Sequence, residues 1–346
     1  MLKKISAVII CVLMVLSLAG CGSKNESTGN TPSNVATKPE TQTNGDTITL
    51  KLATIQDPSN PMSIGYEDLK ERLAEKSGGR IILDIYYNAQ LGGERDEIEG
   101  LRMGSIDITA TATAALAGFM PEIAIFELPF LFRDYEHVDA VLRGEIGEYY
   151  LNKMSDYGVV GLAFQENGFR HITNNVRPIV VPEDLNGVKL RVMESDVSIA
   201  TWKAAGAQPT PMAWPEVFTA LQQKTIDGQE NPASIIVSYK VYEVQKYLSL
   251  SKHVYSPVPM MISKMTWDKL SDEDKKIIQE AVTESTAFEL ELNRSKEAEN
   301  IEIIRNNGVE VNEVDTEAFI AKMKPVWEQF ADRFGMENIN AIANTK

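Results

Sequence analysis

Residues 48–87 read ITLKLATIQDPSNPMSIGYEDLKERLAEKSGGRIILDIYY and contain the pattern that decides the fold. In Ile48–Ala53, apolar and polar residues alternate with a period of two, which is typical of a β-strand. Pro61–Lys76 has the apolar spacing of a helix, and Gly78-Gly79 ends it. Arg80–Tyr87 is rich in β-branched and aromatic residues and predicts a second strand. This strand–helix–strand unit indicates an α/β fold with parallel strands.

The pattern continues on both sides of this unit. A short helix is expected over Glu94–Arg102 and a third strand over Ser105–Thr111, so the first part of the chain predicts a parallel, doubly wound sheet. A second series has strands at 159–164, 188–192 and 208–211, and helices at 197–205, 215–222 and 232–247. Two series of alternating strands and helices predict two α/β lobes.

One segment lacks both proline and glycine over an unusual length, from Ser271 to Asn306. Ser271 with Asp274 predicts a capped start, and Asn306-Asn307-Gly308 predicts an end. A single helix of this length would be about 50 Å long and would exceed one lobe. Either it spans both lobes, or it is two helices with a break that the sequence does not mark.

The first 46 residues predict export and anchoring rather than a folded domain. Lys3 and Lys4 precede an apolar run, which is the order of a secretory signal peptide. Leu18-Ala19-Gly20-Cys21 resembles a bacterial lipobox, so residues 1–20 are expected to be removed and Cys21 to be lipidated. An ordinary signal peptide that contains a cysteine is the alternative. Residues 21–46 are rich in Ser, Thr, Asn, Gly and Pro, which predicts a flexible tether.

The composition argues against several classes of function. A net charge of −15 disfavours nucleic acid as a partner, because its binding needs a basic surface. Cys11 and Cys21 are the only cysteines, and His137, His171 and His253 are far apart, so we expect no metal site and no cofactor. The GxSxG, GxxxxGK[ST] and GxGxxG signatures are absent, and we predict that the chain is not an enzyme.

One arginine lies in an otherwise apolar predicted strand. Arg191 belongs to Val188–Val192, where a buried guanidinium without a partner would be costly. It either pairs with an internal acid as part of the structure, or it holds the carboxylate of a ligand with its planar fork. The residues alone leave both interpretations open.

Seven short motifs carry a resemblance to one known family. In chain order they are QLGGER (90–95), GSID (104–107), LPFLFR (128–133), NGFR (167–170), GVKLRV (187–192), DGQENP (227–232) and YEVQKY (242–247). Each is weak alone, but the ordered set behind a lipobox is specific. Over nearly all of residues 47–330 the chain resembles the extracytoplasmic solute-binding proteins of TRAP transporters, the DctP-like family.

The resemblance implies a periplasmic-binding-protein-like fold of two α/β lobes, joined by crossing strands and by a long helix that spans both. Lobe I would contain residues 47–167 and about 257–296, and lobe II residues 168–256 and about 297–346. A small organic acid would bind in the cleft between the lobes and pass to the TRAP membrane permease subunits. The protein would be lipid-anchored at the outer face of the cytoplasmic membrane, or in the periplasm.

The resemblance also implies roles for five residues. Arg191 would form the salt bridge to the ligand carboxylate, assisted by Arg170, and Asn231 would hydrogen-bond the same carboxylate. Trp214 would pack on the ligand. Glu94 would contact polar groups of the ligand from the opposite lobe.

Two departures from the family bear on the ligand. Trp214 stands where many dicarboxylate and sialic-acid binders have Phe, and a flat indole suits stacking on a sugar ring. Thr109–Thr113 has no carboxylate where sialic-acid binders place one. We predict a sugar acid such as a hexuronate, with a C4-dicarboxylate or another carboxylate as the alternative. An extracellular carbohydrate-active enzyme and an adhesion or scaffold lipoprotein are the other classes considered.

Overall fold

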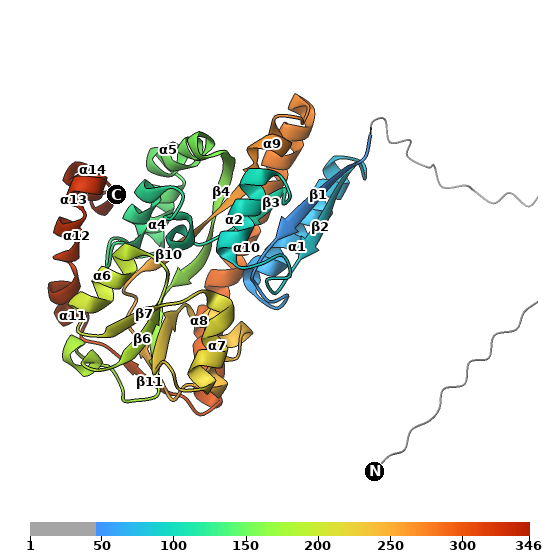
Figure 1. The fold of residues 1–346 in the computed structure, drawn as a ribbon. Coiled ribbons are helices and arrows are strands. Elements are labelled where there is room, and N and C mark those ends of the chain that lie inside the picture. Colours follow the sequence, from blue (N-terminus) through green and yellow to red (C-terminus); the bar gives the residue numbers. More distant parts are fainter. Residues whose placement is uncertain (1–45) are drawn as a thin grey trace, which may run out of the picture. The chain divides into compact units, whose positions relative to one another are not determined.

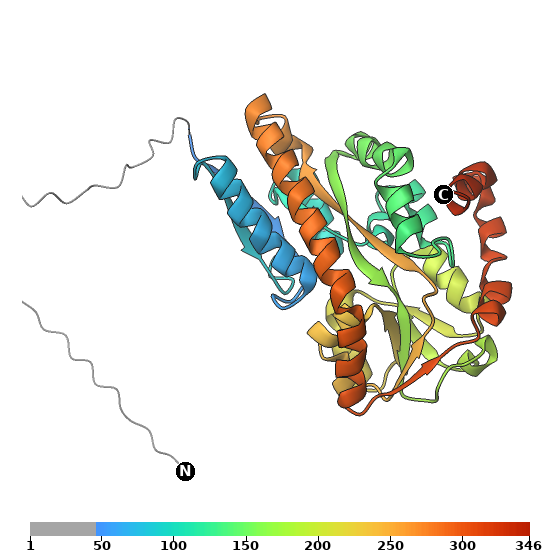
Figure 2. The same cartoon turned by 180° about the vertical axis from the view of Figure 1, so that it is seen from behind.

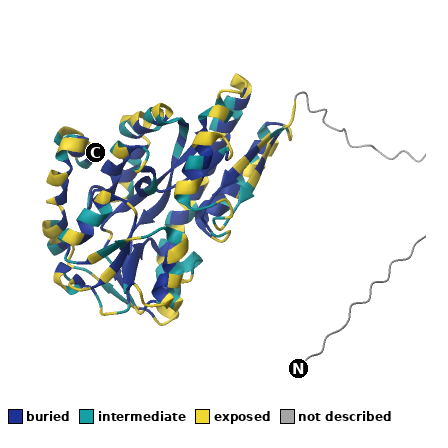
Figure 3. Cartoon of the chain, in the orientation of Figure 1, coloured by how far each residue is buried: buried dark blue, intermediate teal, exposed yellow. Residues whose placement is uncertain are grey.

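The computed structural model describes residues 46–346, so the predicted signal peptide, the lipobox with Cys21 and nearly all of the tether lie outside the described residues. Two mixed sheets organise this part of the chain into two α/β lobes (Figure 1). Their strands are mostly buried, and exposed residues lie mainly on the outer faces of the helices (Figure 3). Within residues 46–346, no helix combines the length and the apolar character that a membrane crossing requires.

The first sheet has five strands. In spatial order they are β2 (Ile81–Tyr86), β1 (Ile48–Ala53), β3 (Ile108–Ala110), β10 (Tyr255–Ser263) and β4 (Val159–Phe169). β1 pairs in parallel with β2 and β3, as predicted. β10 is antiparallel to β3 and β4, so the complete sheet is mixed, and the predicted parallel pairing holds for its first three strands. The reason is topological, because β4 leads toward the second sheet and β10 returns from it.

The helices of the first sheet begin and end at residues suited to these positions. They are α1 (Pro61–Lys76), α2 (Glu94–Met103), α3 (Thr113–Leu116), η1 (Pro121–Glu127), α4 (Tyr135–Leu142), α5 (Glu145–Lys153), η2 (Met154–Tyr157) and α9 (Lys264–Trp267). Asn60 caps α1 by accepting a hydrogen bond from the Met62 amide at 2.9 Å. Gly104, with φ of 74°, ends α2 in the left-handed conformation that glycine adopts without strain.

The second sheet has six strands. In spatial order they are β11 (Glu310–Glu313), β9 (Tyr247–Leu250), β5 (His171–Asn174), β8 (Gly228–Asn231), β6 (Lys189–Val192) and β7 (Gln208–Pro211). Its helical segments are η3 (Pro182–Leu185), α6 (Asp196–Ala204), α7 (Trp214–Gln222), α8 (Ala233–Ser238), η4 (Val241–Glu243) and α11 (Thr316–Met323). The predicted helix over 232–247 is wrong beyond Ser238, because Lys240 takes a positive φ of 52° and turns the chain toward β9.

The long segment forms one unbroken helix, α10 (Asp272–Asn306), which confirms the first of the two interpretations. Ser271 caps it by accepting a hydrogen bond from the Asp274 amide at 3.1 Å. Near its start, Ile278 packs in the apolar core around β1, and near its end Ile304 packs in the core beside β9. Figure 2, which views the molecule from the back, shows α10, in orange, running in front of both sheets.

The last three helices pack back onto the first lobe. They are α12 (Val326–Gln329), α13 (Ala331–Phe334) and α14 (Met336–Ala343). Trp327 and Phe334 share one apolar core with Phe126, and the Trp327 Nε1–H donates to the Pro129 carbonyl at 2.9 Å. The expected lobe boundaries stay a prediction, and these contacts join residues expected in lobe II to residues expected in lobe I.

Candidate ligand-binding site

The five predicted site residues line one cavity, to which elements of both sheets contribute. Its walls are formed by Ile55, Gln56, Glu94, Ala112, Asn167, Arg170, Arg191, Met193, Trp214, Asn231 and Ile235. Glu94, Arg191 and Trp214 also line an adjoining hollow of about 260 Å³, together with Phe119 and Glu194. The five residues therefore border a small cavity of mixed polar and apolar lining that adjoins a larger hollow.

Arg191 is a buried cation that forms no ion pair with an acid among residues 46–346. It lies on β6, is 3% exposed, and donates from Nε and Nη2 to the Met212 carbonyl at 2.8 and 2.6 Å. Among residues 46–346, no carboxylate oxygen lies within 4.0 Å of its guanidinium nitrogens. Burial lowers the pKa of Arg191 to about 10, so it stays charged at neutral pH. The structural ion pair considered for this residue is not formed within the described chain.

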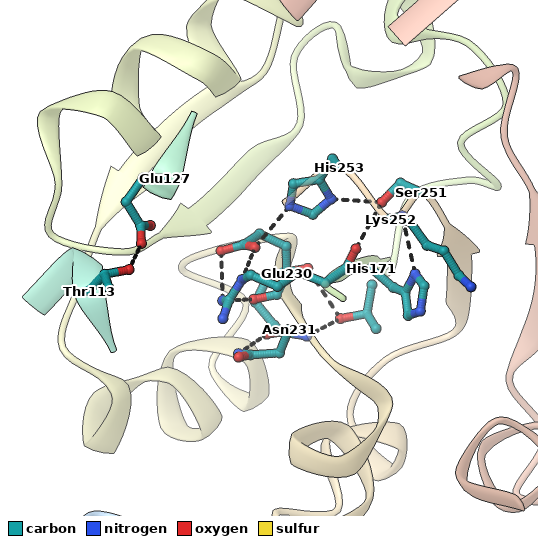
Figure 4. Close-up of polar contacts among 11 residues, drawn as sticks. Thr113, Glu127, His171, Glu230, Asn231, Ser251, Lys252 and His253 are labelled. Atoms are coloured by element: carbon teal, nitrogen blue, oxygen red, sulfur yellow. Dashed lines mark hydrogen bonds and ion pairs between the residues drawn. The ribbon is translucent and has the colours of Figure 1, made fainter. Parts of the chain in front are cut away.

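Arg170, by contrast, forms a buried ion pair through two of its three guanidinium nitrogens. Its Nε and Nη2 lie 2.5 and 2.9 Å from the two carboxylate oxygens of Glu230 on β8. His253 Nε2 lies 3.0 Å from Glu230 Oε2, a contact drawn in Figure 4. Burial opposes ionisation of Glu230, but the charge of Arg170 and these hydrogen bonds outweigh it and lower its pKa to about 2. Glu230 therefore balances the charge of Arg170, while Nη1 of Arg170 has no hydrogen-bond partner among the described residues and stays available to a ligand.

The other three predicted residues differ in how firmly they are held. The Asn231 side-chain nitrogen donates to Gln229 Oε1 at 2.7 Å, so its side-chain oxygen is the atom that stays available to a ligand. Trp214 packs edge-on against Tyr239 at 5.1 Å, and Arg191 lies 5.5 Å from its ring centre. Glu94 Oε1 accepts from the Ala112 amide at 2.9 Å, and burial raises its pKa despite that bond.

Two residues of the cavity were missed from the sequence, Gln56 and Asn167. Gln56 follows the carboxyl end of β1, and ligands of open α/β sheets bind beyond the carboxyl ends of the strands. That position could have indicated Gln56. Asn167 belongs to the NGFR motif, but nothing in the motif shows which of its side chains reach the cavity.

Glu97, a buried acid on the same helix as Glu94, makes the stability of the folded protein depend on pH. Glu97 is fully buried, accepts from Thr109 Oγ1 at 3.0 Å, and its Oε1 has no partner among the described residues. Burial raises its pKa to about 8, above the ordinary value of 4.5. The folded state thus holds a proton that the unfolded chain releases, and the stability that this proton provides is full below about pH 4.5 and is lost as the pH rises through about 8.

We expect Glu97→Gln to remove this loss of folding stability at rising pH, because the glutamine side chain cannot ionise. Between pH 5 and 8, the unfolding free energy of the wild type should carry a downward slope of about 1.4 kcal/mol per pH unit that the variant lacks. Urea unfolding at several pH values measures this, with Glu99→Gln on the same helix as the matched control. Equal slopes in Glu97→Gln and the wild type would contradict the prediction.

A two-lobed α/β body with a charged cavity between its sheets defines a solute-binding protein. The chain belongs to the DctP family, the bacterial extracellular solute-binding proteins of family 7, whose sequence pattern matches residues 52–333. Members of this family bind solutes and are not enzymes, in agreement with the prediction.

Three similar proteins illustrate the family. A TRAP periplasmic solute binding protein from Polaromonas sp. JS666, bound to D-erythronate, is 41% identical, has a TM-score of 0.85, and the match covers 86% of this chain and 99% of that one. The sugar acid binding protein DctPAm from Advenella mimigardefordensis, in complex with galactonate, is 35% identical with a TM-score of 0.84, covering 87% and 98%. The C4-dicarboxylate-binding periplasmic protein DctP of Rhodobacter capsulatus is 31% identical over 85% of this chain and 90% of its own.

Proposed function

We propose that this protein is the extracytoplasmic receptor of a TRAP transporter, which captures a sugar acid such as a hexuronate and delivers it to the membrane permease. The observation that carries the proposal is Arg191, a buried guanidinium whose charge no described carboxylate balances. Such a cation is costly unless an anion reaches it, and a carboxylate fits its fork. The D-erythronate and galactonate bound by two similar proteins support a hydroxylated acid.

The charges of the cavity favour one carboxylate over two. Arg191 is available, Arg170 is neutralised by Glu230, and Glu94 adds a further acid to the wall. In the adjoining hollow, Arg95 is 79% exposed and pairs with Glu99 at 3.2 Å, so it offers little to a bound anion. A C4-dicarboxylate, the alternative ligand, would therefore find, among the described residues that line the cavity, no second buried cation that is free of an acid partner.

The proposal is tested by titrating the purified protein with D-galacturonate, galactonate, D-erythronate and succinate. A ligand that binds only the native state, at 100 times its dissociation constant, should stabilise the protein by about 2.7 kcal/mol. The expected result is tight binding and thermal stabilisation by at least one sugar acid, and weaker binding of succinate. The absence of binding by every acid would contradict the proposal.

We expect Trp214→Phe to weaken a sugar acid more than succinate. The indole borders the cavity beside Arg191, and a phenyl ring offers less area for stacking while the cation stays in place. A loss of about 2- to 10-fold for the sugar acid corresponds to the usual contribution of an aromatic contact. Calorimetry with both ligands measures it, and Trp267→Phe, on α9 away from the cavity, is the control. Equal losses for the two ligands would show that Trp214 only packs in the fold.

The proposed lipid anchor concerns Cys21, outside the described residues. The lipobox-like Leu18-Ala19-Gly20-Cys21 predicts that Cys21→Ser blocks acylation and leaves the protein released or retained as a precursor. Metabolic labelling with a fatty-acid probe should mark the wild type and spare the variant. Labelling of both to the same extent would rule out this anchor.

A further inference from the structure

Two buried side-chain amides in the cavity have no hydrogen-bond partner among the described residues. Gln56 is 5% exposed and Asn167 is 8% exposed, and Oε1 of the first and Oδ1 of the second are buried and unpaired. Both side chains line the same cavity as Arg191. Buried polar atoms are normally paired, so an unpaired amide facing a cavity indicates that something in the cavity completes it.

Hydrogen bonds fix both backbone groups of Gln56. The backbone N–H of Gln56 donates to Thr54 Oγ1 at 3.1 Å, and its backbone carbonyl accepts from the Asn88 backbone N–H at 3.0 Å. The neighbouring Ile55 carbonyl accepts a hydrogen bond from the Tyr239 hydroxyl of the second lobe. Gln56 is therefore presented to the cavity by a fixed segment rather than by a free loop.

Asn167 owes its orientation to an irregularity in the sheet. In the pairing of β4 with β10, Gly168 is opposite Ser256 and Glu166 is opposite Pro257, so Asn167 is the extra residue of a β-bulge. Its carbonyl accepts from Asn293 Nδ2 of α10 at 3.3 Å, which holds the bulge in place. Bulges next to binding sites re-aim a side chain at the expense of a regular ladder. Here the bulged residue lines the cavity.

We infer that Gln56 and Asn167 determine specificity by binding hydroxyl groups of the ligand. An amide offers one acceptor and two donor hydrogens, and a hydroxyl group also donates and accepts, so the two are complementary. A second carboxylate could use only the amide donors, and its charge would face the amide oxygens and Glu94. An alkyl chain would leave both amides unpaired. The inference rests on the proposed function, and it specifies a polyhydroxy monocarboxylic acid as the ligand class.

The experiment pairs hydroxylated acids with their deoxy counterparts. Calorimetry, or competition where binding is weak, compares D-erythronate with n-butyrate, galactonate with n-hexanoate, and both series with succinate. The variants are Gln56→Met and Asn167→Leu, which keep size and remove hydrogen bonding. Gln223→Met, on the exposed end of α7, is the matched control. The corresponding alanine variants replace any that fail to fold, as judged by the melting temperature without ligand.

The wild type is expected to prefer the hydroxylated acid of a pair. Gln56→Met and Asn167→Leu should each weaken that acid by about 5- to 100-fold, the effect of leaving a buried polar group unpaired, and should not weaken the deoxy acid. The control should bind both as the wild type does.

Three outcomes would overturn the inference, and they differ in whether the proposed function survives. Folded variants that bind the hydroxylated acid as tightly as the wild type contradict the assignment of these residues. A wild type that prefers a deoxy acid or succinate contradicts the ligand class, while an organic-acid receptor remains. A wild type that binds no acid removes the proposed function and the inference together.

Discussion

Replacement of Arg191 by alanine is expected to abolish most of the affinity for the ligand while the empty protein stays folded. Truncating one partner of a buried, hydrogen-bonded charge pair costs about 2–5 kcal/mol, mainly through faster dissociation. That range corresponds to roughly 30- to 3,000-fold in affinity. The ligand-free protein should lose little stability, because Arg191 forms no ion pair with residues 46–346 and gives up two hydrogen bonds to the Met212 carbonyl and its contact with the Trp214 ring.

Two further variants make this result specific. Arg191→Lys keeps the charge but loses the planar fork, so it should also bind poorly. Arg177→Ala removes an exposed arginine that does not line the cavity and should bind as the wild type does. Calorimetry gives the affinities, and thermal melting without ligand gives the stabilities. An Arg191→Ala protein that folds and binds with near-wild-type affinity would refute the assignment of the carboxylate to Arg191.

Replacement of Glu230 by alanine is expected to have the opposite signature, a large loss of stability without any ligand present. The variant leaves Arg170 buried and uncompensated, and breaking a buried ion pair in this way costs about 3–5 kcal/mol. The pKa of about 2 for Glu230 adds a pH dependence. A lowered carboxyl pKa contributes stability that is present above the ordinary value of about 4.5 and is lost as the pH falls toward 2.

Urea unfolding of the ligand-free protein at pH 7 and at pH 3 measures both effects. Glu302→Ala is the matched control, because Glu302 forms an exposed pair with Arg305 that should contribute less than about 1 kcal/mol. If Glu230→Ala is no less stable than Glu302→Ala, the buried pair does not support the fold. The difference between the two variants should shrink at pH 3, because Glu230 is then protonated in the unfolded chain while the folded protein still holds it mostly ionised.

Local residue patterns could not rank the two arginines, although the family resemblance did. Both belong to short family-like motifs, and the resemblance implied that Arg191 holds the carboxylate with Arg170 assisting. The contacts separate them, since Arg170 pairs with an acid 60 residues away in the chain and Arg191 does not pair with any described acid. No local pattern encodes which acid reaches which arginine, because β8 meets the end of β4 only when the second sheet forms.

The sequence by itself determined the elements whose signals are local. The alternation in Ile48–Ala53 and the helical spacing in Pro61–Lys76 correctly predicted β1 and α1, because side-chain periodicity reports which face of an element is buried. The caps at Ser271 and near Gly308 predicted the limits of α10, because capping depends on a few adjacent residues.

Tertiary structure alone decided the polar strand and the bulge that build the cavity. Gly228–Asn231 has no apolar alternation, yet all of β8 is buried, because neighbouring strands and the pairing with Arg170 satisfy its polar groups. The bulge at Asn167 exists because β4 and β10 fall out of register where the chain crosses between the sheets. Long-range pairing sets register and burial of this kind, so periodicity in the sequence carries no trace of it.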